Sequence, residues 1–373
     1  MKLSLLQENL NLALTNVSRF VSTKAQLPIL NNILISTDEG RIKLSATNLD
    51  LGINYWIGGK IEEEGSVTIP AHEITEFISY LSSGKIDISL NNNLLNIKSN
   101  KTESDFATTP AADFPELPKF DPKKSFDLDI ALLNNSVSQI AFSAATDDTR
   151  PVLTGILCQF TQENLSLVST DGFRLSQKNI KLVNPITLPE GKEKLSFLIP
   201  ARSLTEVTKL AKNNTKLQIS VVRDDHQIMF VLDDIELLSS VLDGQYPDYQ
   251  KIIPENFSTN IFINREEFSQ AIKIASVFAK ESANVVKLKI QNNSIEITAN
   301  APQKGKNKIE VDARIEGEGL EIAFNYKFVS DFLNICKGKE LVIKLNESLT
   351  PGLFQDQSDP AFTHIIMPVR IQD

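Results

Sequence analysis

The stretch TDGFRL, residues 170–175, has the residue types of a catalytic loop. An apolar segment leads into Asp171, a glycine permits a tight turn, and Arg174 supplies a cation. A carboxylate in such a loop can act as a general base or bind a metal ion. A pair of adjacent acids, Asp147 and Asp148 in TDDTR, offers the oxygen ligands that Mg²⁺ prefers. These three acids define one hypothesis, a metal-dependent enzyme with a three-domain body.

The known signatures of catalysis are missing from the rest of the sequence. No glycine-rich phosphate loop, GxSxG turn or dinucleotide fingerprint occurs. HEITE, residues 72–76, resembles a zinc motif but ends in Glu76 where the second histidine ligand should stand. Cys158 and Cys336 are too far apart in sequence for a metal cluster, and two cysteines make no disulfide framework. We therefore predict no catalytic residue, no metal and no cofactor, and interpret TDDTR as a solvated turn.

The elements that position these residues recur along the chain. A short strand, a helix and an alternating strand follow one another at residues 67–90, 197–221 and 322–345. The three helices are predicted to begin at Pro70, Pro200 and Asn325, which are separated by 130 and 125 residues. The repeat unit is therefore the size of a domain and not a solenoid module.

The likeness extends upstream of these helices. A shift of 123 residues without a gap places residues 10–53 on the second copy, with Pro28 on Pro151 and Thr47 on Thr170. The third copy keeps the helix REEFSQAIKIASVFA and the hairpin VVKLKIQNNSIEITAN but has a shorter connection. We predict an α+β fold of three similar domains, each with two helices packed on antiparallel strands. The predicted domains are residues 1–124, 125–253 and 254–373.

The repeat also gives Asp171 a structural explanation. Under the shift, Thr47 and Asn48 occupy the turn of the first copy that corresponds to Thr170 and Asp171. Such a turn needs only local hydrogen bonds. What the second copy adds is the apolar and cationic segment 173–175.

Charge limits the contacts that the chain can make with DNA. Lys and Arg number 38 and Asp and Glu number 47, a net charge of −9, which argues against a surface covered with nucleic-acid-binding bases. It leaves room for a small basic surface. A base or potential base stands two residues after each predicted helix start, and this recurrence favours a surface that faces DNA over solvated faces of mixed charge. The candidate DNA-binding residues, with two from the preceding helices, are Lys24, His72, Arg202, Lys273 and Lys327.

The N-terminus lacks the unbroken apolar core of a signal peptide, and no apolar run is long enough to cross a bilayer. We expect a soluble, cytoplasmic protein with no membrane partner.

Five motifs, in order along the chain, carry a family resemblance: LPILNNILI, TRPVLTGI, STDGFRLS, DGQYPDYQKIIP and HIIMPVRI. The sequence resembles the bacterial DNA polymerase III beta subunits, the replication sliding clamps, over essentially its whole length. The resemblance implies the DNA clamp fold and a head-to-tail homodimeric ring of six domains. Helices would line a hole that encloses double-stranded DNA without reading its sequence, and no catalytic site is implied. Such a ring confers processivity on the replicative DNA polymerase.

The resemblance also gives the opening loop a role. In the family, this loop, the PDY segment and the C-terminal MPxR strand form a groove for short peptides of the polymerase, the clamp loader and other DNA-processing proteins. Met367 would adapt the pocket to its ligand, while Arg174 and Arg370 would be available for polar contacts. Two departures, Phe173 where histidine is common and Lys251 where arginine is common, suggest altered partner preference. The implied pocket residues are Leu153, Thr170, Gly172, Phe173, Arg174, Leu175, Pro247, Ile252, Ile365, Met367, Pro368, Val369 and Arg370.

Two alternatives remain at this point. One is the metal-dependent enzyme that uses Asp147, Asp148 and Asp171. The other is a peptide-binding scaffold that keeps the groove but does not encircle DNA.

Overall fold

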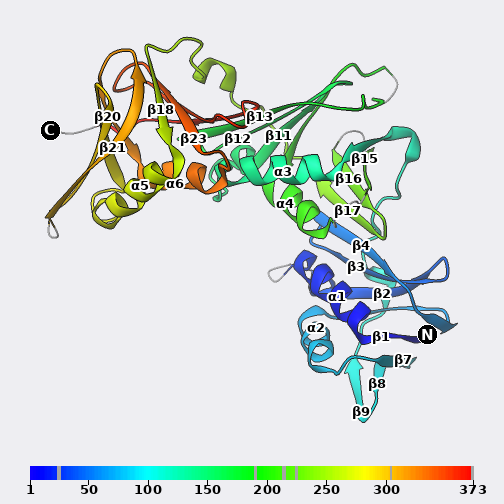
Figure 1. The fold of residues 1–373 in the computed structure, drawn as a ribbon. Helices are drawn as coiled ribbons and strands as arrows, with labels where there is room; N and C mark the ends of the chain where they lie inside the picture. The colour runs from blue at the N-terminus through cyan, green and yellow to red at the C-terminus, as the bar shows by residue number, and fades with distance from the viewer. Residues whose placement is uncertain (23–26, 189–190, 212–215, 223–225, 303–304, 371–373) are drawn as a thin grey trace. The chain divides into compact units, whose positions relative to one another are not determined.

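The structure is a computed structural model. It describes residues 1–373 apart from 23–26, 189–190, 212–215, 223–225, 303–304 and 371–373. The chain forms two compact units (Figure 1). The first contains residues 1–133, 187–191 and 202–241, and the second contains residues 134–186, 192–201 and 242–373.

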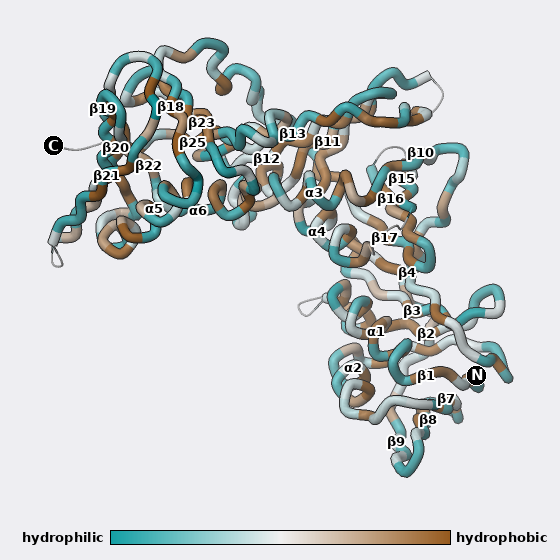
Figure 2. The backbone as a smooth tube through the Cα atoms, in the orientation of Figure 1, coloured by the Kyte–Doolittle hydropathy of each residue, from teal (hydrophilic) through white to brown (hydrophobic). Residues whose placement is uncertain are grey.

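The α-helices in the described residues are amphipathic. In α5, the buried residues Phe268, Ile272, Ala275 and Ala279 recur at the spacing of one helix face. The helix accordingly carries both brown apolar and teal polar residues in Figure 2. The helices are α1 (Gln7–Val17), α2 (Ala71–Tyr80), α3 (Ile130–Ile140), α4 (Ala201–Leu210), α5 (Arg265–Ala279) and α6 (Tyr326–Ile335).

The predicted repeat is confirmed at the level of single elements. Both ends of α3 lie 123 residues after those of α1, and the strand Asn164–Thr170 lies 123 residues after Arg41–Thr47. The second helices begin directly after Pro70, Pro200 and Asn325, as predicted. The side chain of Asn325 caps α6 by accepting a hydrogen bond from the backbone N–H of Lys327 at 3.0 Å.

The first compact unit contains two antiparallel sheets. A five-stranded sheet has the order β5-β1-β7-β8-β9, and an eight-stranded sheet has the order β10-β15-β16-β17-β4-β3-β2-β6. The strands of the smaller sheet are β1 (Lys2–Leu6), β5 (Lys60–Glu63), β7 (Lys85–Asn91), β8 (Leu94–Ser99) and β9 (Thr102–Ala107). Those of the larger sheet are β2 (Asn32–Asp38), β3 (Arg41–Thr47), β4 (Leu51–Ile57), β6 (Ser66–Pro70), β10 (Ser125–Asp129), β15 (Lys216–Val222), β16 (Gln227–Leu232) and β17 (Ile235–Ser240).

The second unit contains twelve hydrogen-bonded strands in the order β14-β11-β12-β13-β25-β24-β23-β18-β21-β20-β19-β22. Their bounds are β11 (Gly155–Phe160), β12 (Asn164–Thr170), β13 (Arg174–Lys181), β14 (Leu195–Pro200), β18 (Thr259–Asn264), β19 (Val285–Gln291), β20 (Ser294–Ala301), β21 (Gly305–Glu316), β22 (Glu321–Asn325), β23 (Glu340–Leu345), β24 (Gly352–Asp356) and β25 (Phe362–Ile366).

Two strand pairs link successive copies of the repeat. β4 of the first copy pairs with β17 of the second, and β13 of the second pairs with β25 of the third. The second pair joins segments that are far apart in sequence, with Arg174 opposite Ile366 and Leu175 opposite Ile365. This pairing positions the candidate site.

In the part of the chain that the structure describes, no helix is long and apolar enough to span a membrane.

Candidate partner-binding and DNA-binding sites

The turn formed by residues 170–175 is held by its own side chains. The Thr170 hydroxyl donates to the Arg174 carbonyl at 2.6 Å and accepts from the Gly172 N–H at 3.0 Å. Asp171 Oδ1 accepts from the backbone N–H groups of Phe173 and Arg174 at 2.9 and 3.0 Å. Gly172 has a φ of +92°, the left-handed region that glycine adopts at no steric cost.

The first copy makes the same four bonds. Thr47 bonds the carbonyl of Leu51 and the N–H of Leu49, while Asn48 accepts from the N–H groups of Asp50 and Leu51. Leu49, at the position of Gly172, has a φ of +79°. The interpretation of Asp171 as a structural turn residue is therefore confirmed.

Arg174 is held inside the second unit, with its side chain only 11% exposed. Its guanidinium donates to Asp171 at 2.9 Å, to Asp331 at 2.5 Å and to the Phe142 carbonyl at 2.7 Å. It also lies over the rings of Phe142 and Phe328, at 5.2 and 4.7 Å from their centroids. Arg174 thus already uses its charge in intrachain contacts, and its contact with a partner stays a prediction.

Two of the three acids of the catalytic hypothesis, Asp147 and Asp171, accept hydrogen bonds within local turns. Asp147 Oδ1 accepts the N–H of Thr149 at 3.1 Å, as in a local turn. Burial raises the pKa values of Cys158 and Cys336, which keeps both as thiols. Among the described residues, no three His, Cys, Asp or Glu side chains are grouped as metal ligands.

Three distant segments meet beside the turn. The Met367 N–H donates to the Phe173 carbonyl at 2.8 Å, which continues the β13–β25 pairing. Leu175 and Ile365 share a buried cluster with Tyr249, from the short 3₁₀ helix Tyr249–Ile252 that contains the PDY tyrosine. The structure thus brings together the three segments from which the pocket was expected to form.

The apolar side chains at this meeting point divide into a buried base and an exposed rim. Leu175 and Ile365 are buried, whereas Phe173, Met367 and Ile252 are 59%, 37% and 38% exposed. Exposed apolar groups above a core are typical of an interaction surface.

The remaining predicted pocket residues have varied surroundings. Leu153 is buried in the 3₁₀ helix Pro151–Thr154, and Pro247 is exposed. Pro368 and Val369 are half-buried, with the Val369 N–H donating to the Ala323 carbonyl at 2.8 Å, while Arg370 is exposed.

The recurrent bases occupy equivalent places. His72, Arg202 and Lys327 are each the second residue of their helix, and each is exposed. Arg202 lies near the end of α1, where its Nη2 donates to the Arg19 carbonyl at 3.0 Å. Lys273 is exposed on α5, and Lys24 lies outside the described residues.

No sequence pattern pointed to the partners of Arg174. Asp331, Phe142 and Phe328 lie far from it along the chain, on α6 or just after α3. The sequence also showed no sign that Glu206, on α4, is buried beside Arg19. Its Oε2 lies 3.3 Å from Nη1 of Arg19.

Comparison with known proteins places the whole chain in one family. Sequence profiles for the N-terminal, central and C-terminal domains of the DNA polymerase III beta subunit match residues 1–118, 127–248 and 250–370. The chain belongs to the DNA polymerase III beta subunit family. The beta sliding clamp of Bacillus subtilis is 32% identical over 99% of this chain and all of its own length, and that of Synechocystis is 31% identical over all of both chains.

Solved structures show the same fold. The Bacillus subtilis sliding clamp matches this beta subunit chain with a TM-score of 0.93 at 31% identity, and the Thermotoga maritima beta subunit with 0.91 at 28%, each over the full length of both chains. The predicted DNA clamp fold, with three domains of helices and antiparallel sheets, is confirmed.

Proposed function

We propose that the chain is a DNA sliding clamp, which encircles duplex DNA and tethers the replicative polymerase. Family membership over the full length is the observation that carries this proposal. The threefold recurrence of an exposed base near the start of a helix supports it, because such bases can contact phosphates without reading sequence. The chain's place would be the cytoplasm, where a bacterium replicates its DNA.

The clamp would be a head-to-tail homodimer. Two copies of domains 1–124, 125–253 and 254–373 give six similar units, and a closed ring leaves no domain edge unmatched. His72, Arg202, Lys273 and Lys327, with Lys24, would face the DNA. Enclosure, and not tight binding, would then prevent escape, which suits a chain whose net charge is −9.

Partner proteins would bind through short peptides at the turn 170–175. Phe173, Met367 and Ile252 would cover the apolar side chains of such a peptide, and the buried cluster beneath them would keep the surface fixed. Arg370 is exposed and would supply one of the polar contacts expected from the family resemblance. Polymerase and clamp loader would therefore compete for one site.

In this proposal the chain itself catalyses no reaction. The alternative enzyme needs Asp171 as a base or ligand, and that carboxylate already accepts two backbone N–H groups and the Arg174 side chain.

Primer extension by the cognate polymerase on a long single-stranded circle tests the function. Adding the chain with its clamp loader should lengthen the products made in a single binding event. Products of unchanged length would contradict tethering.

A further inference from the structure

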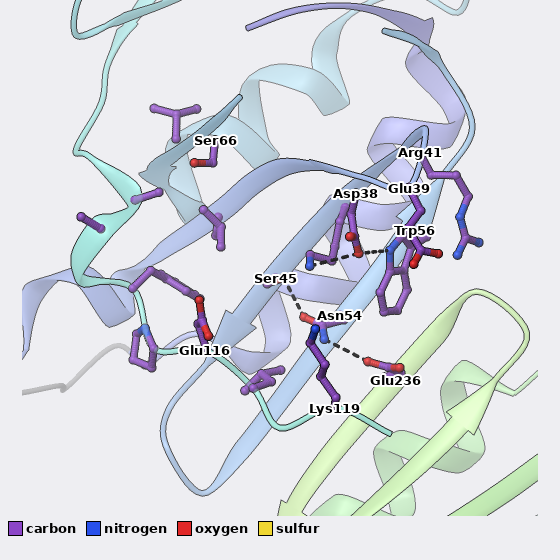
Figure 3. A pocket seen from close by; sticks show the side chains of 18 of the residues that line it. Asp38, Glu39, Arg41, Ser45, Asn54, Trp56, Ser66, Glu116, Lys119 and Glu236 are labelled. Carbon is purple, nitrogen blue, oxygen red and sulfur yellow. Dashed lines mark hydrogen bonds and ion pairs between the residues drawn. The ribbon is translucent and has the colours of Figure 1, made fainter. Parts of the chain in front are cut away.

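A large cavity lies in the first compact unit, and none of its lining residues belongs to the proposed DNA-binding or partner-binding sets (Figure 3). Its volume is 1250 Å³, above the range of about 300–1,000 Å³ that is usual for small-molecule sites. One wall is a face of the strands β2, β3, β4, β17 and β16, and the other is the segment 110–120.

Hydrogen bonds fix this segment at both ends. Thr109 exchanges two backbone hydrogen bonds of 3.0 Å with Thr68 on β6, and the Asp121 carbonyl accepts from Ser220 on β15 at 3.1 Å. β6 is an edge strand, and β15 is next to the opposite edge. Segment 110–120 therefore crosses the sheet as a strap, and the space under it is built into the fold.

The floor of the cavity is a polar row that crosses the sheet. Ser45, Asn54 and Glu236 are direct neighbours on β3, β4 and β17. The Ser45 hydroxyl donates to Asn54 Oδ1 at 2.7 Å, and Asn54 Nδ2 donates to Glu236 Oε2 at 3.1 Å (Figure 3). Apolar side chains, Leu34 and Val231, continue the row at its two ends.

Glu236 is the charged group at the end of this row. Burial raises its pKa, so the carboxylate is poorly solvated where it stands. A cation placed against its other oxygen would compensate that cost. Glu236 is therefore the natural anchor for a positively charged ligand.

The other charged side chains that line the cavity do not cancel the preference of Glu236 for a cation. Lys43 pairs with Asp38 at 3.1 Å, and Arg41 pairs with Asp234 at 2.8 Å. Both cations also lie over the ring of Trp56. Each of these two bases therefore has an acid partner, while the charge of Lys43 also acts on Glu236 and opposes the rise in its pKa.

The rim is acidic. Three exposed acids line the cavity, Glu39, Glu116 and Asp233, against one further base, Lys119. Leu117 and Phe120, on the strap, line the cavity and also pack against the buried residues Val222, Met229 and Leu238. Acidic side chains outnumber basic ones around the cavity, and apolar side chains lie beside them. Such a surface complements a ligand that has both a positive charge and apolar groups.

We propose that this cavity binds a short peptide segment of a partner protein, in which an arginine or lysine is flanked by apolar residues. The basic side chain would pair with Glu236, and the flanking residues would pack on Leu117, Phe120 and Val231. The volume is larger than one side chain needs, which favours a peptide over a free amine. This proposal does not depend on the clamp function, because it involves none of the DNA-facing or turn residues.

Trp56 makes the test specific, because it is the only tryptophan in the chain and lines the cavity. We would titrate the full chain with acetyl-Leu-Arg-Leu-amide and follow tryptophan fluorescence. Three probes serve as controls: the same peptide with citrulline, which keeps the shape of arginine without its charge, the same peptide with aspartate, and free arginine amide. Glu236→Gln keeps an acceptor for Asn54, and Glu193→Gln is a matched change at an exposed glutamate of the other compact unit.

The arginine peptide should change the fluorescence saturably, and the citrulline and aspartate peptides should bind about tenfold more weakly or worse, since they cannot form the charged hydrogen bond. Glu236→Gln should weaken the arginine peptide to a similar degree, while Glu193→Gln should not. Equal binding of the citrulline peptide to the wild-type chain, or no response to the arginine peptide, would overturn the proposal without reliance on any variant. Arginine amide binding as tightly as the peptide would overturn the assignment to a peptide.

Discussion

Phe173→Ala should weaken the binding of a polymerase-derived peptide while leaving the fold intact. The side chain is 59% exposed, so it contributes little to the core. A phenylalanine has about 200 Å² of side-chain surface, so a covering peptide can remove roughly 120 Å² from water. At about 25 cal/mol per Å², full coverage is worth about 3 kcal/mol, and half coverage about 1.5 kcal/mol. We therefore expect affinity to fall by a factor of about 10 to 150.

Calorimetric titration of the peptide against the wild-type and variant chains measures this decrease in affinity. Leu49→Ala is the matched control, because Leu49 lies in the equivalent turn of the first copy and is 52% exposed. It should leave affinity unchanged. A Phe173→Ala chain that binds within a factor of about two of wild type would show that Phe173 does not contact the peptide, because such a difference is below about 0.5 kcal/mol.

Three other residue groups give testable expectations for stability and for DNA retention. Arg174→Met should lower the free energy of unfolding by about 2 kcal/mol or more, since it leaves two carboxylates without their cation; an unchanged thermal midpoint would contradict this. Arg202→Glu with Lys327→Glu should weaken retention on DNA and reduce the salt slope by about one unit for each phosphate that the chain no longer neutralises, while equal retention at all salt concentrations would reject their placement. Burial lowers the pKa of His364 to about 3, so the unfolded chain takes up a proton below about pH 6.5 that the folded chain does not. The contribution of His364 to the free energy of unfolding is fully present above about pH 6.5 and should fall by about 1.4 kcal/mol per pH unit down to about pH 3. His364→Gln should remove this part of the slope in a pH series of thermal unfolding. An identical slope in the variant would exclude His364 as its cause.

The repeat could be predicted from the sequence, because local residue patterns determine where its helices and turns form. Helix periodicity and the residues before each helix predicted where α2, α4 and α6 begin. The gapless shift of 123 residues predicted that Asp171 and Asn48 make equivalent turns, and their hydrogen bonds are the same. Such turns depend on a few neighbouring residues, so a single sequence contains the information.

Contacts between segments that are distant in sequence could not be predicted in this way. Arg174 looked like a surface cation, but its surroundings are decided by Asp331 and Phe328 on α6, which no local pattern connects to it. The strap over the polar row around Glu236 was not predictable for the same reason, because residues 110–120 show only a proline-rich sequence. Side-chain pairing across a fold depends on register and packing, which a single sequence does not contain.

If the clamp encloses DNA topologically, its retention should depend on whether the DNA is circular. The chain would be loaded onto nicked circular duplex DNA by its clamp loader and separated from unbound protein by gel filtration. It should elute with the circle and be released when one restriction cut makes the DNA linear. Retention that is unchanged after the cut, or no retention on the intact circle, would contradict a clamp that holds DNA by encircling it.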